Sequence, residues 1–339
     1  MAAPVRALNR PRHGVTAGRL RRGAFGALLS AALAGAAVAA PAWPDKPVHL
    51  IVAFAAGGAH DALARVIQPR LAAALGQPLV IDNRSGAGGN IAAEAVAKSP
   101  PDGFTLLVAS EAMATHPALY PALHYEPLRD LAPVTKLADF PIALVTRTGL
   151  PSGSVRELVS LARGRPGELS YGSAGIGTSG HLAGELFQRT AGIALAHVPY
   201  KGGGPALTDL LAGRIDLMFL SVSLAAPQLR QGKLKAVAIA AEDPTPLLPG
   251  VPSMSASGYP GFEAHLFSAV FAPAGTPEPV LRRLAGDIAG ALADAEVRRR
   301  VEELGGVPAA RGPDALRREL EDRARRWGGL IREKNIHAE

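Results

Sequence analysis

The sequence predicts an α/β protein of two lobes joined by a hinge, and three observations support this expectation. From Pro47 onward, short apolar runs typical of strands alternate with helical periods, an order that implies parallel sheets with helices on both faces. This alternating block occurs twice, first over 48–109 and again from 142 to 240. Strands over 142–146 and 236–240 would then pass between the blocks, and two crossings act as a hinge that closes a cleft on a ligand.

In the first block, strands are expected where apolar runs are uninterrupted, and helices where apolar residues recur every three or four positions. The clearest stripe is formed by Leu63, Ile67, Leu71 and Leu75 in a helix over 61–75. The other elements, in order, are strands over 48–54 and 79–81, a glycine-rich loop over 83–90, a helix over 91–97 and a strand over 105–109.

In the second block, a helix over 154–163 is expected to begin at Ser154, because a serine can accept hydrogen bonds from the first free N–H groups of a helix. The other elements are strands over 142–146, 169–171, 196–198, 215–219 and 235–240, helices over 179–190 and 205–212, and C-terminal helices that begin at Pro277 and Pro313. We assign residues 43–146 and 236–339 to lobe I, and residues 147–235 to lobe II.

Composition excludes several classes of protein. The 339 residues are 48% hydrophobic, which is too apolar for a disordered chain and enough for two cores. The absence of cysteine excludes a disulfide scaffold, a cysteine nucleophile and thiolate metal sites. The nine histidines form no H-x-H or H-E-x-x-H pattern, so neither a metal nor another cofactor is expected.

The N-terminal residues 1–42 have the pattern of a secretory signal peptide. They hold six arginines and no acidic residue, followed by a short alanine-rich apolar run that ends in Ala-x-Ala sites. Without this segment, 30 basic residues stand against 29 acidic ones, a net charge of +1. A nearly neutral chain gives no electrostatic reason to expect nucleic acid as a partner. We expect export to the periplasm.

The first glycine-led loop follows a strand and opens a helix, at residues 56–61. Free backbone N–H groups and the positive end of the helix dipole converge there, so an anion such as a carboxylate is the preferred guest. Gly57, Gly58, His60 and Asp61 are therefore candidate ligand-binding residues. The alternative is a tight turn in which Asp61 only starts the helix.

A matching loop at 172–181 opens a helix in the second block. Gly175, Gly177 and Gly180 satisfy G-x-G-x-x-G, but the acidic residue that a dinucleotide site needs about 20 positions later is missing. Hydroxyl and N–H groups in such a loop can instead hydrogen-bond a ligand. The candidates from this lobe and from strand ends are Ser110, Ser173, Gly177, Thr178, His181, Tyr200 and Ser221.

Ser179 leaves a second function open, that of an exported serine hydrolase. A nucleophile elbow requires Gly-x-Ser-x-Gly, and here the last glycine comes one position early. The loop over 83–90 lacks the Lys-Ser/Thr pair of a phosphate-binding P-loop. For that loop, ligand binding and a purely structural turn both remain open.

Segments spread in order over 43–339 resemble the Bug/TctC family, the extracytoplasmic solute-binding proteins of tripartite tricarboxylate transporters. They include 43–48 (WPDKPV), 83–90 (NRSGAGGN), 101–105 (PDGFT), 197–202 (HVPYKG) and 271–277 (FAPAGTP). The resemblance implies a two-lobed periplasmic-binding-protein fold of type II kind that closes on a ligand carboxylate. By position, the first strand–helix loop holds Gly57, Gly58 and Asp61, and Ser173, Thr178 and His181 face it.

The resemblance also implies no enzymatic activity, a small organic acid or amino acid as ligand, and a monomer that partners the membrane subunits of such a transporter. A ligand-sensing component without a transport role is the alternative. The sequence departs from the family pattern at Ala55, Ala56 and His60 in the first loop, at Leu220-Ser221 and at Leu266-Phe267. Leu220 motivates the hypothesis of a more apolar pocket, suited to an aromatic or aliphatic carboxylate.

Overall fold

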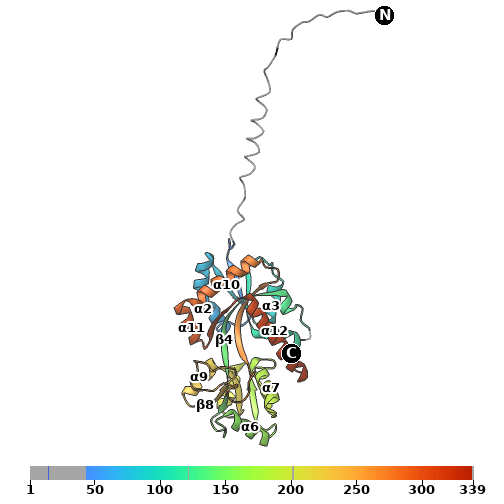
Figure 1. Ribbon diagram of the computed structural model, residues 1–339, viewed down its shortest axis with the longest axis vertical. Coiled ribbons are helices and arrows are strands. Elements are labelled where there is room, and N and C mark those ends of the chain that lie inside the picture. Colours follow the sequence, from blue (N-terminus) through green and yellow to red (C-terminus); the bar gives the residue numbers. More distant parts are fainter. Residues whose placement is uncertain (1–13, 15–42, 121, 201, 338–339) are drawn as a thin grey trace, which may run out of the picture. The chain divides into compact units, whose positions relative to one another are not determined.

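The strands of the computed structural model form one hydrogen-bonded system of ten strands that both lobes share. The structure describes residues 14, 43–120, 122–200 and 202–337, so the predicted signal segment lies almost entirely outside the described residues. In the order of pairing, the strands run β2-β1-β3-β9-β4-β7-β5-β6, and β10 and β8 also pair with β4. Strand β4 is therefore the element around which the two halves are organised (Figure 1).

Lobe I contains a parallel trio of strands extended by antiparallel ones. Its strands are β1 (Val48–Val52), β2 (Leu79–Asn83), β3 (Thr105–Ser110), β9 (His265–Pro273), the first part of β4 (Leu131–Arg147) and β10 (Val307–Arg311). Its helices are α2 (Ala59–Leu75), α3 (Asn90–Ala97), α10 (Glu278–Ala293), α11 (Ala295–Glu303) and α12 (Pro313–Glu333). Short helical turns η1 (Ala87–Gly89), η2 (Glu111–Ala114), α4 (His116–Leu119) and α5 (Pro127–Asp130) connect them.

Lobe II repeats this plan with a second parallel trio. Its strands are β5 (Ser170–Ser173), β6 (Ala196–Pro199), β7 (Leu217–Ser221) and β8 (Leu234–Ile239), joined to the second part of β4. Its helices are α6 (Val155–Gly164), α7 (Ser179–Ala191), α8 (Gly203–Leu211) and α9 (Val222–Arg230). As predicted, Ser154 caps α6, its Oγ accepting a hydrogen bond of 3.2 Å from Glu157 N. The prediction of two α/β lobes is confirmed, and where a mostly parallel sheet was predicted in each lobe, a parallel trio is joined to antiparallel strands.

Two crossings join the lobes, but the second is not the strand over 236–240 that the sequence predicted, because β8 (Leu234–Ile239) pairs with β4 within lobe II. Over 131–141, β4 pairs with β9 of lobe I, and over 142–147 it pairs with β7 and β8 of lobe II. The chain returns through the segment 240–264, between β8 and β9. Strands β9 and β10 and helix α9 were not predicted, and β4 begins eleven residues before the predicted strand over 142–146.

Helix α12 contributes to the cores of both lobes. Its Leu316 and Leu320 pack in lobe I with the α3 face of the sheet. Its Trp327, Leu330 and Ile331 pack in lobe II with residues of α6 and α7. Met254, Phe262 and Ala264 also lie in this second core. We therefore propose that lobe II includes 142–146, 236–264 and the last turns of α12, in addition to the predicted 147–235.

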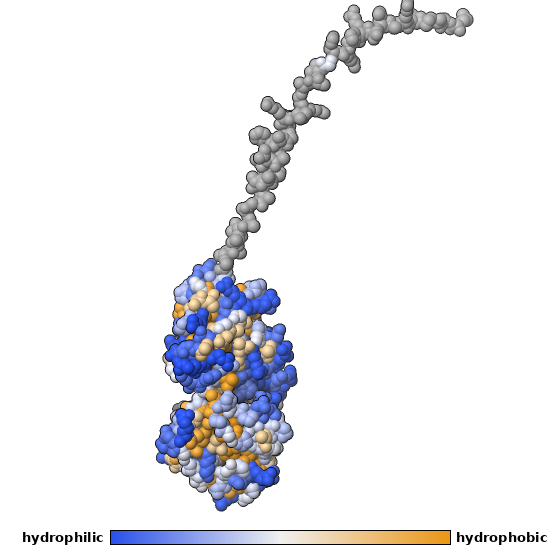
Figure 2. Space-filling model, turned by 60° about the vertical axis from the view of Figure 1, so that its left-hand side comes forward, coloured by the Kyte–Doolittle hydropathy of each residue, from blue (hydrophilic) through white to orange (hydrophobic). Residues whose placement is uncertain are grey.

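Apolar side chains are exposed on both lobes, and Val80, Ile91 and Val307 are examples from lobe I. In Figure 2 the lower lobe shows more apolar surface than the upper one, and the molecule narrows between them. Ile176, Leu211 and Leu224 are among the exposed large apolar residues of lobe II. Among the described helices, none has the length and apolar character that crossing a lipid bilayer requires.

Candidate functional site

The start of α2 is a closed loop held by its own side chains. Gly57 adopts a left-handed φ of 81°, and its N–H donates to Asp61 Oδ2 at 2.9 Å. Gly58 is the N-cap residue and its N–H donates to Ala55 O at 3.3 Å. The predicted loop and helix start are therefore present, and Asp61 closes the loop.

Asp61 is buried and fully engaged. Besides Gly57 N–H, it accepts hydrogen bonds from Asn83 Nδ2 at 2.9 Å and from Arg65 Nε at 3.0 Å. The hydrogen bond from Arg65 is the main reason that the pKa of Asp61 is lowered to about 2. The Asp61 carboxylate therefore builds the loop, and its contacts here match the tight-turn alternative for this residue.

His60 lies in the first turn of α2 and stacks on Phe54, with ring centroids 4.1 Å apart. Its Nδ1 is buried and has no hydrogen-bond partner among the described residues. Burial lowers its pKa to about 4, so the imidazole is neutral at physiological pH. It therefore brings no positive charge to a ligand.

The start of α7 in lobe II has the same geometry with different chemistry. Gly177 has a left-handed φ of 77°, and its N–H donates to His181 Nδ1 at 3.0 Å, again four residues along the chain. The His181 ring stacks on His197 at 4.0 Å. Burial lowers the pKa of both imidazoles to about 4. The neutral imidazole of His181 therefore accepts the glycine N–H in lobe II, as the carboxylate of Asp61 does in lobe I.

The hydroxyl groups predicted to meet a ligand in lobe II are also engaged within the loop. Ser173 is buried at the end of β5, with Oγ 2.7 Å from His197 Nε2 and accepting from Gly175 N at 3.2 Å. Thr178 Oγ1 donates to Gly175 O at 2.7 Å. These side chains shape the loop, and in this structure their polar atoms point into it.

The three remaining predicted residues lie at other strand ends, and one of them, Tyr200, adjoins the lobe II loop through its N–H, which donates to Ser173 O at 3.0 Å. Ser110 caps η2, its Oγ accepting from Ala112 N at 3.3 Å. Tyr200 donates to Asp209 Oδ2 at 2.8 Å. Ser221 accepts from Ser223 Oγ at 3.2 Å at the end of β7. Leu220 packs in the core of lobe II, so the reason for predicting a more apolar pocket is removed.

The available donors at both helix starts are backbone N–H groups. Within the described residues, the N–H groups of Ala59, His60 and Asp61 in α2 have no hydrogen-bond partner. The same holds in the described part of α7 for Ser179, Gly180 and His181. Such groups, at the positive end of a helix dipole, are suited to a carboxylate. Both sets lie at the carboxyl ends of parallel strands, where open α/β sheets take ligands.

The lobe I loops meet lobe II at the start of α7, which places this helix start at the boundary between the lobes. The Glu111 carboxylate of η2 accepts a hydrogen bond from Ser179 Oγ at 2.5 Å. Leu119 of α4 packs against Gly177, where a Cβ would lie 2.8 Å from Leu119 Cδ1. Sequence reasoning missed both residues, although an acidic residue directly after a buried strand was a usable signal.

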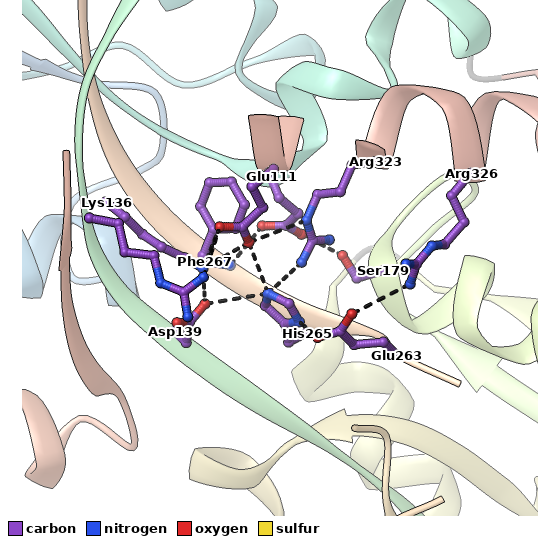
Figure 3. A network of polar contacts seen from close by, with 11 residues as sticks. Glu111, Lys136, Asp139, Ser179, Glu263, His265, Phe267, Arg323 and Arg326 are labelled. Carbon is purple, nitrogen blue, oxygen red and sulfur yellow. Dashed lines mark hydrogen bonds and ion pairs between the residues drawn. The ribbon is translucent and has the colours of Figure 1, made fainter. Parts of the chain in front are cut away.

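A second feature near the boundary is a network of charged groups around the buried Lys136, shown in Figure 3. Lys136 Nζ lies 2.5 Å from Asp139 and 2.8 Å from Glu319, and His265 Nε2 lies 3.2 Å from Glu319. Burial by itself raises the pKa of Glu319, but the hydrogen bond with His265 and the charge of Lys136 outweigh it and lower the pKa to about 2.

Asp139, His265 and Glu319 have ligand atoms close enough together to hold a metal ion. The Lys136 ammonium already supplies the cation that the two carboxylates require, so the geometry favours an ionic tie between β4, β9 and α12. This network borders a cavity of about 740 Å³ that is lined by residues of both lobes. None of the residues predicted to bind ligand lines that cavity.

The contacts of Ser179 bear on the hydrolase alternative. Ser179 donates to a carboxylate, and no hydrogen bond links it to a histidine of the described residues. His181 Nδ1 is already the acceptor for Gly177 N–H. The serine–histidine arrangement of a nucleophile and its base is therefore not formed.

Two lobes joined by crossing strands, with a glycine-led helix start in each, define the fold of a periplasmic binding protein, and solved structures agree. The Rpa4515 protein of R. palustris with adipate is 36% identical and superimposes with a TM-score of 0.76 over 87% of this chain and all of that one. MatC from Rhodopseudomonas palustris with bound malate is 36% identical, with a TM-score of 0.72 over 85% of this chain and all of that one.

Sequence comparison gives the family. Residues 63–336 match the family described as tripartite tricarboxylate transporter family receptor, TctC. Protein BugT of Bordetella pertussis is 38% identical over 311 residues, which are 91% of this chain and 95% of that protein. The chain therefore belongs to the TctC (Bug) family of solute-binding proteins, and the predicted resemblance is confirmed.

Proposed function

We propose that this protein captures a small carboxylate-bearing metabolite between its lobes and delivers it to the membrane subunits of a tripartite tricarboxylate-type importer. It acts in the periplasm, as a monomer, and leaves the ligand chemically unchanged. The observation that carries this proposal is the pair of helix starts, one per lobe, whose first three N–H groups have no partner within the described chain. Carboxylates are suited to such positions.

The charge of the loops supports this ligand class. His60 and His181 are neutral, and Asp61 is tied to Arg65, so these side chains bring no free positive charge to the two helix starts. The backbone N–H groups would then bind the carboxylate through hydrogen bonds whose directions are fixed by the helix start. The adipate and malate named for two related structures are both small dicarboxylates. We therefore propose an aliphatic dicarboxylate or hydroxydicarboxylate as ligand, with one carboxylate at each helix start.

Thermal denaturation of the purified protein with a panel of organic acids tests the proposal. A ligand at 100 times its Kd stabilises the folded state by about 2.7 kcal/mol, a clear rise in Tm. Calorimetry then gives Kd, and mass spectrometry of the recovered ligand checks that it is unchanged. Binding of none of the acids, or conversion of the ligand to product, would refute it. Uptake that depends on co-expressed membrane subunits would distinguish transport from sensing.

A further inference from the structure

Helix η2 and helix α4 carry a segment of lobe I, Glu111–Leu119, that reaches the ligand loop of lobe II. Glu111 directly follows β3 and is buried. One of its oxygens accepts from Phe267 N of β9 at 2.9 Å, within lobe I. The other accepts from Ser179 Oγ of α7, in lobe II. The carboxylate therefore bridges the two lobes.

The partners of the Glu111 carboxylate favour the arrangement in which the two lobes are in contact. Within the described residues, no lysine or arginine forms an ion pair with Glu111. Its charge is instead satisfied by the Phe267 N–H, by the Ser179 hydroxyl and by the positive end of the α7 dipole. A hydrogen bond to a buried charge is stronger than a neutral one. Separating the lobes would remove the hydroxyl and the dipole together.

Leu119 makes the second contact on the same helix start. It is carried by α4 of lobe I, yet it is 3% exposed and packs in the hydrophobic core of lobe II. It lies against Gly177, the residue whose N–H is donated to His181. A left-handed glycine is required there both for its φ and for the close approach of Leu119.

Helix α12 packs against both sides of the contact between Glu111–Leu119 and the start of α7. It packs against η2, α4 and α7, so it spans the lobe I segment and the lobe II helix. Its Arg323 and Trp327, together with Glu111 and Ser179, enclose a cavity of about 20 Å³. That volume holds about one water molecule. The contact is thus nearly sealed, as expected of packed protein surfaces.

From these contacts we infer that Glu111–Leu119 is a closure latch that positions the lobe II ligand loop, Gly175–Ser179, against lobe I. Glu111 and Leu119 are positioning residues, because they hold Ser179 and Gly177 without being ligand contacts themselves. The inference deepens the proposed function and rests on it only for its effect on affinity. The latch itself acts whether or not a ligand is bound.

The test uses the absence of cysteine from the chain. Cysteines introduced by Ala73→Cys in α2 and Ser160→Cys in α6, both exposed positions, carry spin labels whose separation reports lobe closure. In this labelled parent, Leu119→Ala with Ser179→Ala should shift the ligand-free distance distribution toward longer values. The same variant should raise the Kd for malate or adipate by about tenfold, within the usual range of coupling between sites.

Controls separate the latch from general loss of stability. Leu71→Ala removes an equally buried leucine in the core of lobe I, and it should lower Tm without changing the label distances. Leu119→Met in the labelled parent keeps the side-chain volume, and it should leave the label distances unchanged. Distances in the double variant that equal those of the parent would overturn the latch, as would a parent that is open under all conditions. If no carboxylate binds, the proposed function fails, and the ligand-free distances still decide the latch.

Discussion

The two helix starts, α2 in lobe I and α7 in lobe II, share a backbone and differ in the group that closes it. In both, a left-handed glycine donates its N–H to a side chain four residues later. In α2 the acceptor is a carboxylate tied to an arginine, and in α7 it is a neutral imidazole stacked on a second one. The geometry of donors at a helix start therefore does not depend on which residue type closes the loop. Stability, pH response and steric tolerance should differ between the two lobes.

The largest difference is expected for the two glycines. Gly57→Ala meets open space and is strained only by its φ, which costs about 1 kcal/mol. Gly177→Ala has the same strain and would also press on Leu119, at about 1–3 kcal/mol more. We expect Gly177→Ala to weaken ligand binding by up to about 100-fold and Gly57→Ala by only a few-fold. Calorimetric titration of both variants measures this, and equal losses would show that Leu119 does not constrain the loop.

The second difference concerns the closing side chains. His181→Ala removes a buried ring and leaves Gly177 N–H without its acceptor, so we expect a loss of about 2–4 kcal/mol in the free energy of unfolding. Asp61→Asn keeps the shape but loses the charge opposite Arg65, at about 1–2 kcal/mol. Urea denaturation gives both values. A larger loss in Asp61→Asn would reverse the proposed ranking.

The third difference is in pH dependence. The pKa of His181 is about 4 in the folded protein and 6.5 in an exposed imidazole, so the unfolded chain takes up the proton first. The free energy of unfolding should fall as pH drops from 6.5 to 4, by about 3 kcal/mol per such histidine. Asp61, with a folded pKa of about 2 against an ordinary 3.8, loses its contribution only as pH falls below 3.8 toward 2.

Denaturation curves at pH 7 and pH 5 test this, with His181→Gln as the comparison. The variant should lose less stability between the two pH values than the wild type does. Identical losses would place the titrating histidine elsewhere, at His60, His116 or His197, whose pKa values are also lowered to about 4 by burial.

The smallest difference is expected for the serines that end β3 and β5. Ser173→Ala leaves His197 and Gly175 without a partner in a buried position, and should cost about 1–2 kcal/mol. Ser110→Ala removes one long cap bond, and should cost about 0.5–1 kcal/mol. Thermal denaturation compares them. A Ser110→Ala effect as large as that of Ser173→Ala would mean that the strand end of lobe I is equally dependent on its hydroxyl.

The strands, helices and loops that could be predicted from the sequence are those that local residue patterns encode. Strands β1 and β3, helix α2 and both glycine loops follow from apolar periodicity and from strand–glycine–helix order. Strand β9 was missed because it is defined by pairing with β3 and β4, which lie more than a hundred residues earlier in the chain. Strand β4 was shortened because Pro133, Lys136 and Asp139 look like a surface loop until α12 covers them.

For the candidate site, the sequence located the loops but not the roles of their side chains. Asp61, Ser173 and Thr178 have the chemistry of ligand contacts, and the structure shows their polar atoms engaged within their own loops. Which partner takes a carboxylate or hydroxyl depends on groups brought together by folding, such as Asn83 beside Asp61 and His197 beside Ser173. Glu111 joins Ser179 across 68 positions, which no local motif records.

The placement of α12 also sets the order in which the two hydrophobic cores can be completed. The second core takes Trp327, Leu330, Ile331 and Ile336 from the last residues of the chain, while its other members come from 119–264. Because these side chains stand at the C-terminal end, lobe II stays without its full interior until the last residues of the chain are in place. A C-terminal truncation before Trp327 should therefore leave lobe I folded and lobe II susceptible to proteolysis.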